Sequence, residues 1–160
     1  MINQRLFDHY KIDTEKNLNI KQICARPFDT LLIDKNGTCY ACECTSWLPQ
    51  AIGNIQLQSI DEILKNNNRT VLQKSITDGS YRYCNEKQCS YLLSRRFHEK
   101  QTNDIRYLRL AIDDSCNLRC PSCRKGKIFH STGQQFIKRI KMAKKILLFI
   151  ENYKLPLSIN

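Results

Sequence analysis

Three cysteines in the second half of the chain have the residue type and spacing for metal chemistry. Cys116, Cys120 and Cys123 form a Cys-x3-Cys-x2-Cys pattern. A compact loop with this spacing aims three thiolates at three corners of an iron–sulfur cube and leaves one iron without a protein ligand. An open iron distinguishes a reactive centre from an electron carrier, in which four cysteines saturate the cluster. We therefore predict that these thiolates are cluster ligands, and we assign no catalytic acid, base or nucleophile.

The other cysteines precede residue 90, and their use depends on the redox compartment. They are Cys24, Cys39, Cys42, Cys44, Cys84 and Cys89. Residues 1–16 are polar and charged without the apolar core of a secretory signal, and no apolar run approaches membrane-spanning length. We therefore expect a cytoplasmic protein without a membrane partner, in which thiols stay reduced. The odd total of nine cysteines also argues against complete disulfide pairing, so metal or cluster ligation is the leading interpretation.

Length, composition and charge limit the remaining possibilities. A chain of 160 residues fits one ordinary domain or two small ones, and it is too short for a complete β/α barrel. The hydrophobic fraction of 41% and charged fraction of 26% are typical of a globular protein. Much of the net charge of +11 comes from residues 115–150, where no acidic residue occurs. Such a field attracts anions, nucleic acid included, although a solvated helix face is the simpler interpretation.

Local patterns predict a β-hairpin in the first cysteine group. Apolar segments 30–33 and 38–41 flank the Asn-Gly pair at 36–37, which is a strong hairpin signal. Cys39 and Cys42 would lie on the second strand or just beyond it.

Short helices should follow this hairpin. Ser59 and Glu62 have the spacing of a capping box, so a helix should begin at Ser59. The asparagines at 66–68 indicate a break, and a second helical segment around 70–76 should end at the Asp-Gly pair 78–79.

The second cysteine group lies between a predicted strand and a predicted helix. Residues 105–112 are rich in β-branched, aromatic and leucine residues, which favours a strand. Residues 131–153 predict an amphipathic helix whose apolar stripe contains Phe136, Ile140, Ala143, Leu147 and Ile150. Residues 157–159 could open another strand, which makes this order the start of a βαβ unit.

This arrangement of strand, cysteine loop and helix resembles the signature of the radical S-adenosylmethionine superfamily. The resemblance implies that Cys116, Cys120 and Cys123 hold a 4Fe–4S cluster whose open iron binds S-adenosylmethionine. One electron would then cleave S-adenosylmethionine to a 5′-deoxyadenosyl radical, which abstracts hydrogen from a substrate. The implied partners are S-adenosylmethionine, a reductant such as flavodoxin or ferredoxin, and a peptide or small polar substrate.

The first cysteine group resembles a SPASM domain, a type of domain that accompanies many radical S-adenosylmethionine enzymes and holds auxiliary clusters. Twelve residues separate Cys24 from Gly37, and four more precede Cys42, which matches the opening motif of that domain. The resemblance implies one auxiliary 4Fe–4S cluster on the following cysteines: Cys24, Cys42, Cys84 and Cys89. Cys39 and Cys44 would be spare, or one of them would replace Cys42. Zinc is the rival metal for this site because four thiolates with uneven spacing suit a structural zinc ion.

These expectations define an α+β fold with two units. A small SPASM-like domain, a hairpin plus short helices, would occupy 1–93 and a linker 94–104. The first β/α unit of a radical S-adenosylmethionine barrel would then occupy 105–160, which leaves the barrel incomplete. We expect such a truncated chain to be inactive alone. We expect the apolar stripe of its last helix to pack on the first domain or on another chain, or to stay partly mobile, with a partner chain the first place to look.

Two other functions remain open on the sequence. A zinc-stapled module could combine the Cys120-x2-Cys123 pair with Cys39-x2-Cys42 or with Cys84-x4-Cys89 and bind nucleic acid or protein through the basic helix. A non-catalytic iron–sulfur electron carrier is the other alternative.

Overall fold

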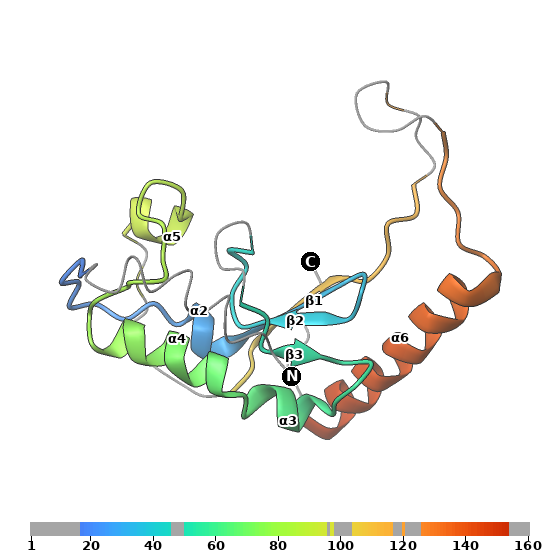
Figure 1. Ribbon diagram of the computed structural model, residues 1–160, viewed down its shortest axis with the longest axis horizontal. Helices are drawn as coiled ribbons and strands as arrows, with labels where there is room; N and C mark the ends of the chain where they lie inside the picture. Colours follow the sequence, from blue (N-terminus) through green and yellow to red (C-terminus); the bar gives the residue numbers. More distant parts are fainter. Residues whose placement is uncertain are drawn as a thin grey trace.

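The computed structural model describes residues 17–45, 50–95, 97, 104–116, 120 and 126–153. In these residues a small four-stranded sheet with the strand order β3-β2-β1-β4 is packed with helices (Figure 1). The predicted α+β class is confirmed at this level. Cys123, the possible strand at 157–159 and most of the predicted linker lie outside the described residues.

The predicted hairpin is confirmed and forms the middle of the sheet. Strands β1 (Thr30–Asp34) and β2 (Thr38–Tyr40) pair antiparallel, and β3 (Gly53–Asn54) pairs with β2. The Asp34 carboxylate accepts hydrogen bonds from the backbone N–H groups of Asn36 and Thr38, both at 2.8 Å, which closes the turn. Gly37 has φ +77°, and a Cβ there would lie 2.9 Å from Gln56 Nε2, so the turn requires glycine.

Strand β4 joins the hairpin in a parallel pairing that local sequence patterns do not reveal. It spans Tyr107–Ala111 and pairs with β1 from Thr30↔Tyr107 to Asp34↔Ala111. Segments on both sides of the predicted linker therefore share one sheet. The predicted domain boundaries stay predictions, but the two segments are not packed as independent units.

The bounds of the short helices are α2 (Arg26–Asp29), α3 (Ile60–Leu64), α4 (Asn67–Thr77) and α5 (Ser90–Leu93). Two of them, α3 and α4, were predicted from the sequence, whereas α2 and α5 were not, and α4 begins inside the break predicted at 66–68. The predicted capping box begins α3: the Ser59 backbone N–H donates to the Glu62 carboxylate at 2.8 Å, and the Ser59 hydroxyl accepts from the Glu62 N–H at 3.3 Å. Gly79, with φ +76°, lies just beyond the end of α4, as predicted.

The long helix α6 (Gly133–Tyr153) packs on the same core as the hairpin and flanks the sheet in Figure 1. Its buried side chains are Met142, Ile146 and Phe149. They pack with hairpin residues and with residues between β2 and α4, including Leu31, Ile33, Ile52, Ile55 and Ile63. One face of the helix is therefore buried within the chain, and a partner chain over its exposed apolar residues stays a prediction.

The predicted apolar stripe of α6 coincides only in part with the buried face, because Ile150 packs against the core but other members of the stripe are exposed. Phe136, Ile140 and Leu147 are 38%, 42% and 57% exposed. The error has a simple cause: residues 146–150 are all apolar, so the periodicity of that segment does not select one face. None of the described helices is long and apolar enough to cross a membrane.

Candidate functional site

Three cysteines of the first group pack together in a buried group. Cys42, Cys44 and Cys89 are 7%, 9% and 5% exposed and pack together. Cys42 and Cys44 lie just after β2, whereas Cys89 is the N-cap residue of α5, so the fold brings together two distant segments. The Cys44 and Cys89 Sγ atoms are 3.9 Å apart, within hydrogen-bonding range for sulfur. Leu72, Tyr83, Tyr91 and Leu92 pack around the thiols.

Cys24 lies beside these three thiols. It is 8% exposed and packs with Phe28, Ile76 and Tyr81, and its backbone N–H donates to the Tyr81 hydroxyl at 2.8 Å. Burial raises the pKa of Cys24 to about 12, and the charges of Cys42 and Cys89 contribute to the rise. Cys24 is therefore close enough to Cys42 and Cys89 to feel their charges. We use the term thiol cluster below for Cys24, Cys42, Cys44 and Cys89.

The thiol cluster distributes its protons unequally. A hydrogen bond with Cys44 lowers the pKa of Cys42, and the hydrogen bond between Cys44 and Cys89 lowers the pKa of Cys89 to about 6. The same hydrogen bonds raise the pKa of Cys44. Cys44 is therefore the thiol of this group that keeps its proton most firmly. Metal binding would displace that proton, because thiolates are the ligands.

Cys39, in contrast, is a core residue. It is fully buried on β2 within the main hydrophobic core, and its Sγ contacts the Gly37 carbonyl oxygen at 3.5 Å. Burial raises its pKa to about 12. Cys39 and Cys42 pack in separate hydrophobic clusters, and their use as half of a zinc knuckle stays a prediction. Of the two cysteines left spare by the sequence, the structure brings Cys44 to the other thiols and leaves Cys39 apart.

Cys84 occupies the rim of this site. It is partly buried and packs against the hydrophobic cluster that contains Cys24 and Tyr81. Its charge also helps to raise the pKa of Tyr81, after the larger effect of burial. The predicted ligand set Cys24, Cys42, Cys84 and Cys89 is thus gathered in one region, and ligation by these residues stays a prediction.

The donor chemistry of the thiol cluster fits a thiolate-bound metal. Buried sulfur ligands suit an iron–sulfur cluster or zinc and do not suit magnesium or calcium. The thiols are gathered as a hydrogen-bonded set: in the part of the chain that the structure describes, no group of three His, Cys, Asp or Glu side chains has a metal-holding arrangement.

The cysteine loop of the second group is held at its base. The backbone N–H and C=O of Cys116 both bond to Ile128, with N···O distances of 2.9 and 3.1 Å. Cys116 is partly buried and Cys120 is exposed, whereas Cys123 lies outside the described residues. Convergence of the three loop thiolates is therefore still a prediction. The described residues that flank the loop extend away from the sheet (Figure 1).

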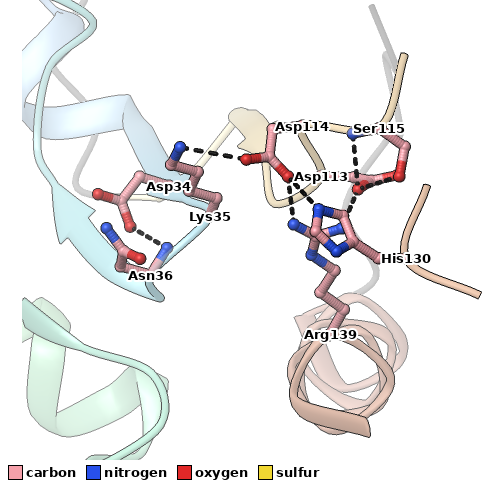
Figure 2. Close-up of polar contacts among 8 residues, drawn as sticks. All are labelled: Asp34, Lys35, Asn36, Asp113, Asp114, Ser115, His130 and Arg139. Carbon is pink, nitrogen blue, oxygen red and sulfur yellow. Dashed lines mark hydrogen bonds and ion pairs between the residues drawn. The ribbon is translucent and has the colours of Figure 1, made fainter. Parts of the chain in front are cut away.

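A polar network fixes this loop neck, which we define as residues 113–116 and 128–130 (Figure 2). Arg139 of α6 forms ion pairs with both Asp113 and Asp114. Lys35 of the hairpin turn lies 3.2 Å from the Asp114 carboxylate, and His130 Nε2 lies 3.1 Å from it. Hydrogen bonds from Lys35 and Arg139 lower the pKa of Asp114 to about 2. Sequence reasoning missed this network, and its only local signal is the acidic pair directly before the loop.

Comparison with known families adds a decisive observation. Residues 24–90 match SPASM, an iron–sulfur cluster-binding domain. The match begins at Cys24 and includes Cys42, Cys44, Cys84 and Cys89, so it covers the whole thiol cluster. We therefore describe residues 24–90 as a SPASM-like domain, and this match indicates that the chain binds an iron–sulfur cluster. No curated protein and no solved structure matches the chain significantly.

Proposed function

We propose that this chain is an iron–sulfur protein of the radical S-adenosylmethionine type. Its SPASM-like domain would hold an auxiliary 4Fe–4S cluster, and its cysteine loop would hold a second 4Fe–4S cluster that binds S-adenosylmethionine. The observation that carries the proposal is the buried packing of Cys42, Cys44 and Cys89 inside the SPASM match, with Cys24 near enough to feel the charges of Cys42 and Cys89.

The geometry refines the auxiliary ligand set. Cys24 and Cys89 approach the site from opposite ends of the SPASM-like domain, and Cys42 follows the hairpin between them. Cys44 is buried and contacts Cys89, whereas Cys84 is only partly buried, so burial favours Cys44 as the fourth ligand. Cys84 would then hold the edge of the site or replace Cys44 after rearrangement.

The loop site rests on its spacing and on its position in the fold. Cys116 follows the C-terminal end of β4, a strand in parallel pairing, and such strand ends are the usual place for ligand sites. When bound there, the cluster would supply the electron that cleaves S-adenosylmethionine, so that a radical can take hydrogen from a peptide or polar metabolite. The residues of the chain would bind the cluster through Cys116, Cys120 and Cys123 and hold the loop neck through Arg139.

Anaerobic reconstitution tests both sites together. Iron, sulfide and zinc are counted per chain, and the reduced protein is examined by electron paramagnetic resonance with and without S-adenosylmethionine. The proposal predicts about eight irons and a signal that changes when S-adenosylmethionine is added. About four irons with no such change would restrict the function to the SPASM-like domain. Zinc without sulfide would favour the zinc-stapled interaction module.

A further inference from the structure

A buried arginine lies between two tyrosine rings beside the thiol cluster. Arg26 is only 7% exposed, and its guanidinium carbon lies 4.1 Å from the ring centroid of Tyr107 and 5.0 Å from that of Tyr91. Tyr107 belongs to β4 and Tyr91 to α5, so the guanidinium is enclosed by elements from distant parts of the chain. Both rings attract it through cation–π interactions.

Arg26 also hydrogen-bonds the Tyr107 side chain and feels the charges of Asp29 and Glu43, but these groups do not use all of its donors. Its Nε and Nη1 atoms are buried and have no hydrogen-bond partner among the described residues. The nearby Glu43 carboxylate is bonded instead to Arg109 at 3.0 Å. A guanidinium is always protonated and unpaired buried donors are costly, so the two unpaired donors of Arg26 can serve a further acceptor.

The position of Arg26 identifies the acceptor. Its own backbone N–H hydrogen-bonds the Cys24 sulfur, and its guanidinium charge is felt by the same sulfur. The Tyr91 ring that contacts Arg26 also packs against Cys42, Cys44 and Cys89. One aromatic side chain thus touches both the cation and the thiols.

We propose that Arg26 donates hydrogen bonds to the sulfur atoms of the auxiliary cluster and raises the reduction potential of that cluster. This inference rests on the proposed function, because it requires an iron–sulfur cluster on the thiol cluster. A cluster bound by thiolates is anionic, and reduction by one electron adds a further negative charge. A buried cation stabilises the more negative state more strongly, and hydrogen bonds to sulfur act in the same direction. Arg26 therefore favours uptake of the electron.

Redox titration of the full chain tests the charge effect. Alanine at Cys116, Cys120 and Cys123 leaves the auxiliary cluster as the only reporter, and dithionite supplies the electron. R26Q should lower the equilibrium constant for reduction about tenfold, which corresponds to about 59 mV for one electron. R26K keeps the charge but loses the planar array of donors, so its potential should lie between those of R26Q and the arginine form.

Arg69 provides the matched control. It is also 7% exposed, but its guanidinium donates to the carbonyl oxygens of Leu64 at 3.0 Å and Phe28 at 2.7 Å. R69Q should leave the potential unchanged. A fully loaded R26Q protein with an unchanged potential, or an equal shift in R69Q, would overturn the role of Arg26.

A second measurement needs no substitution in the reporting protein, so it does not depend on whether a variant folds. The chain with Arg26 intact is labelled with arginine that carries ¹⁵N only in the guanidinium group and is then reduced, and pulsed electron paramagnetic resonance is used to detect coupling between the cluster and a guanidinium nitrogen. We expect a coupling that disappears in R26K, and its absence in the labelled protein would overturn the proposal. Failure of the proposed function is distinguishable, since that protein would hold no sulfide-bound iron at all.

Discussion

The two groups of cysteines differ in what holds them in place. The thiol cluster of the SPASM-like domain is buried and surrounded by leucine and tyrosine side chains. Of the loop thiols that the structure describes, Cys116 is partly buried and Cys120 is exposed. The loop neck is held by ion pairs and by one backbone bridge.

This difference separates two ways of building a metal site. Apolar burial is a strong, non-directional force that gathers thiols before any metal arrives. Exposed ion pairs contribute little individually, although a guanidinium shared by two carboxylates gives more geometric control. We therefore expect the auxiliary site to be sensitive to its thiols and the loop site to be sensitive to its neck.

The largest expected effect comes from removing one thiol of the buried site. C44A should lose the auxiliary cluster, which amounts to about four irons per chain, because Cys44 contacts Cys89 inside the site. C39A is the matched control: Cys39 is equally a buried cysteine near the hairpin, but it belongs to the main core, so iron content should be retained. Iron and sulfide analysis after reconstitution measures both. Full iron content in C44A would indicate that Cys84, and not Cys44, is the fourth ligand.

The next effect tests the neck of the loop. R139Q should release the loop iron to a chelator about tenfold faster, because it leaves Asp113 and Asp114 as adjacent carboxylates without their shared cation. The auxiliary cluster should be unaffected. K141Q removes the same charge from an exposed position of α6 and should change nothing. Equal release rates in the two variants would show that the neck does not hold the loop site.

A smaller effect concerns proton occupancy in the apoprotein. The pKa of Cys89 is lowered from an ordinary 9.0 to about 6, first because it accepts a hydrogen bond from Cys44. A lowered pKa stabilises the fold fully above pH 9.0, and this contribution declines as pH falls and is lost below about 6. Thiolate absorbance during a pH titration should show one thiol ionising near 6. In C44A that thiol should ionise at a higher pH, and an unchanged titration would refute the hydrogen bond.

The smallest effect is acid weakening of the loop neck. The pKa of Asp114 is lowered from 3.8 to about 2 by hydrogen bonds from Lys35 and Arg139. The ionised Asp114 carboxylate therefore stabilises the loop neck above pH 3.8, and this effect is lost as the pH falls toward 2. Protection factors of the Cys116 and Ile128 amides should decrease over this interval, whereas amides in β1 should keep theirs. D114N should remove the pH dependence, and its persistence would assign the effect to another group.

The sequence predicts local structure well in this protein because the signals are local. The Asn-Gly turn, the capping box of Ser59 and the glycine after α4 each depend on residues a few positions apart. The type and position of β4 and α6 also followed from their composition.

What the sequence did not predict depends on contacts between distant segments. The parallel pairing of β1 with β4, the choice of Cys44 over Cys39 and the enclosure of Arg26 by Tyr91 and Tyr107 are set by tertiary packing. The cysteine motifs placed the candidate ligands in two groups, but spacing alone cannot show which thiols of a group are close together.

The central claim is that the buried thiols of the SPASM-like domain hold an iron–sulfur cluster independently of the loop. It is tested most directly by counting iron, sulfide and zinc in the full chain with alanine at the loop cysteines, Cys116, Cys120 and Cys123. We predict about four irons and about four sulfides per chain, both lost when alanine also replaces Cys24. Zinc without sulfide, or iron that disappears with the loop cysteines, would contradict the claim.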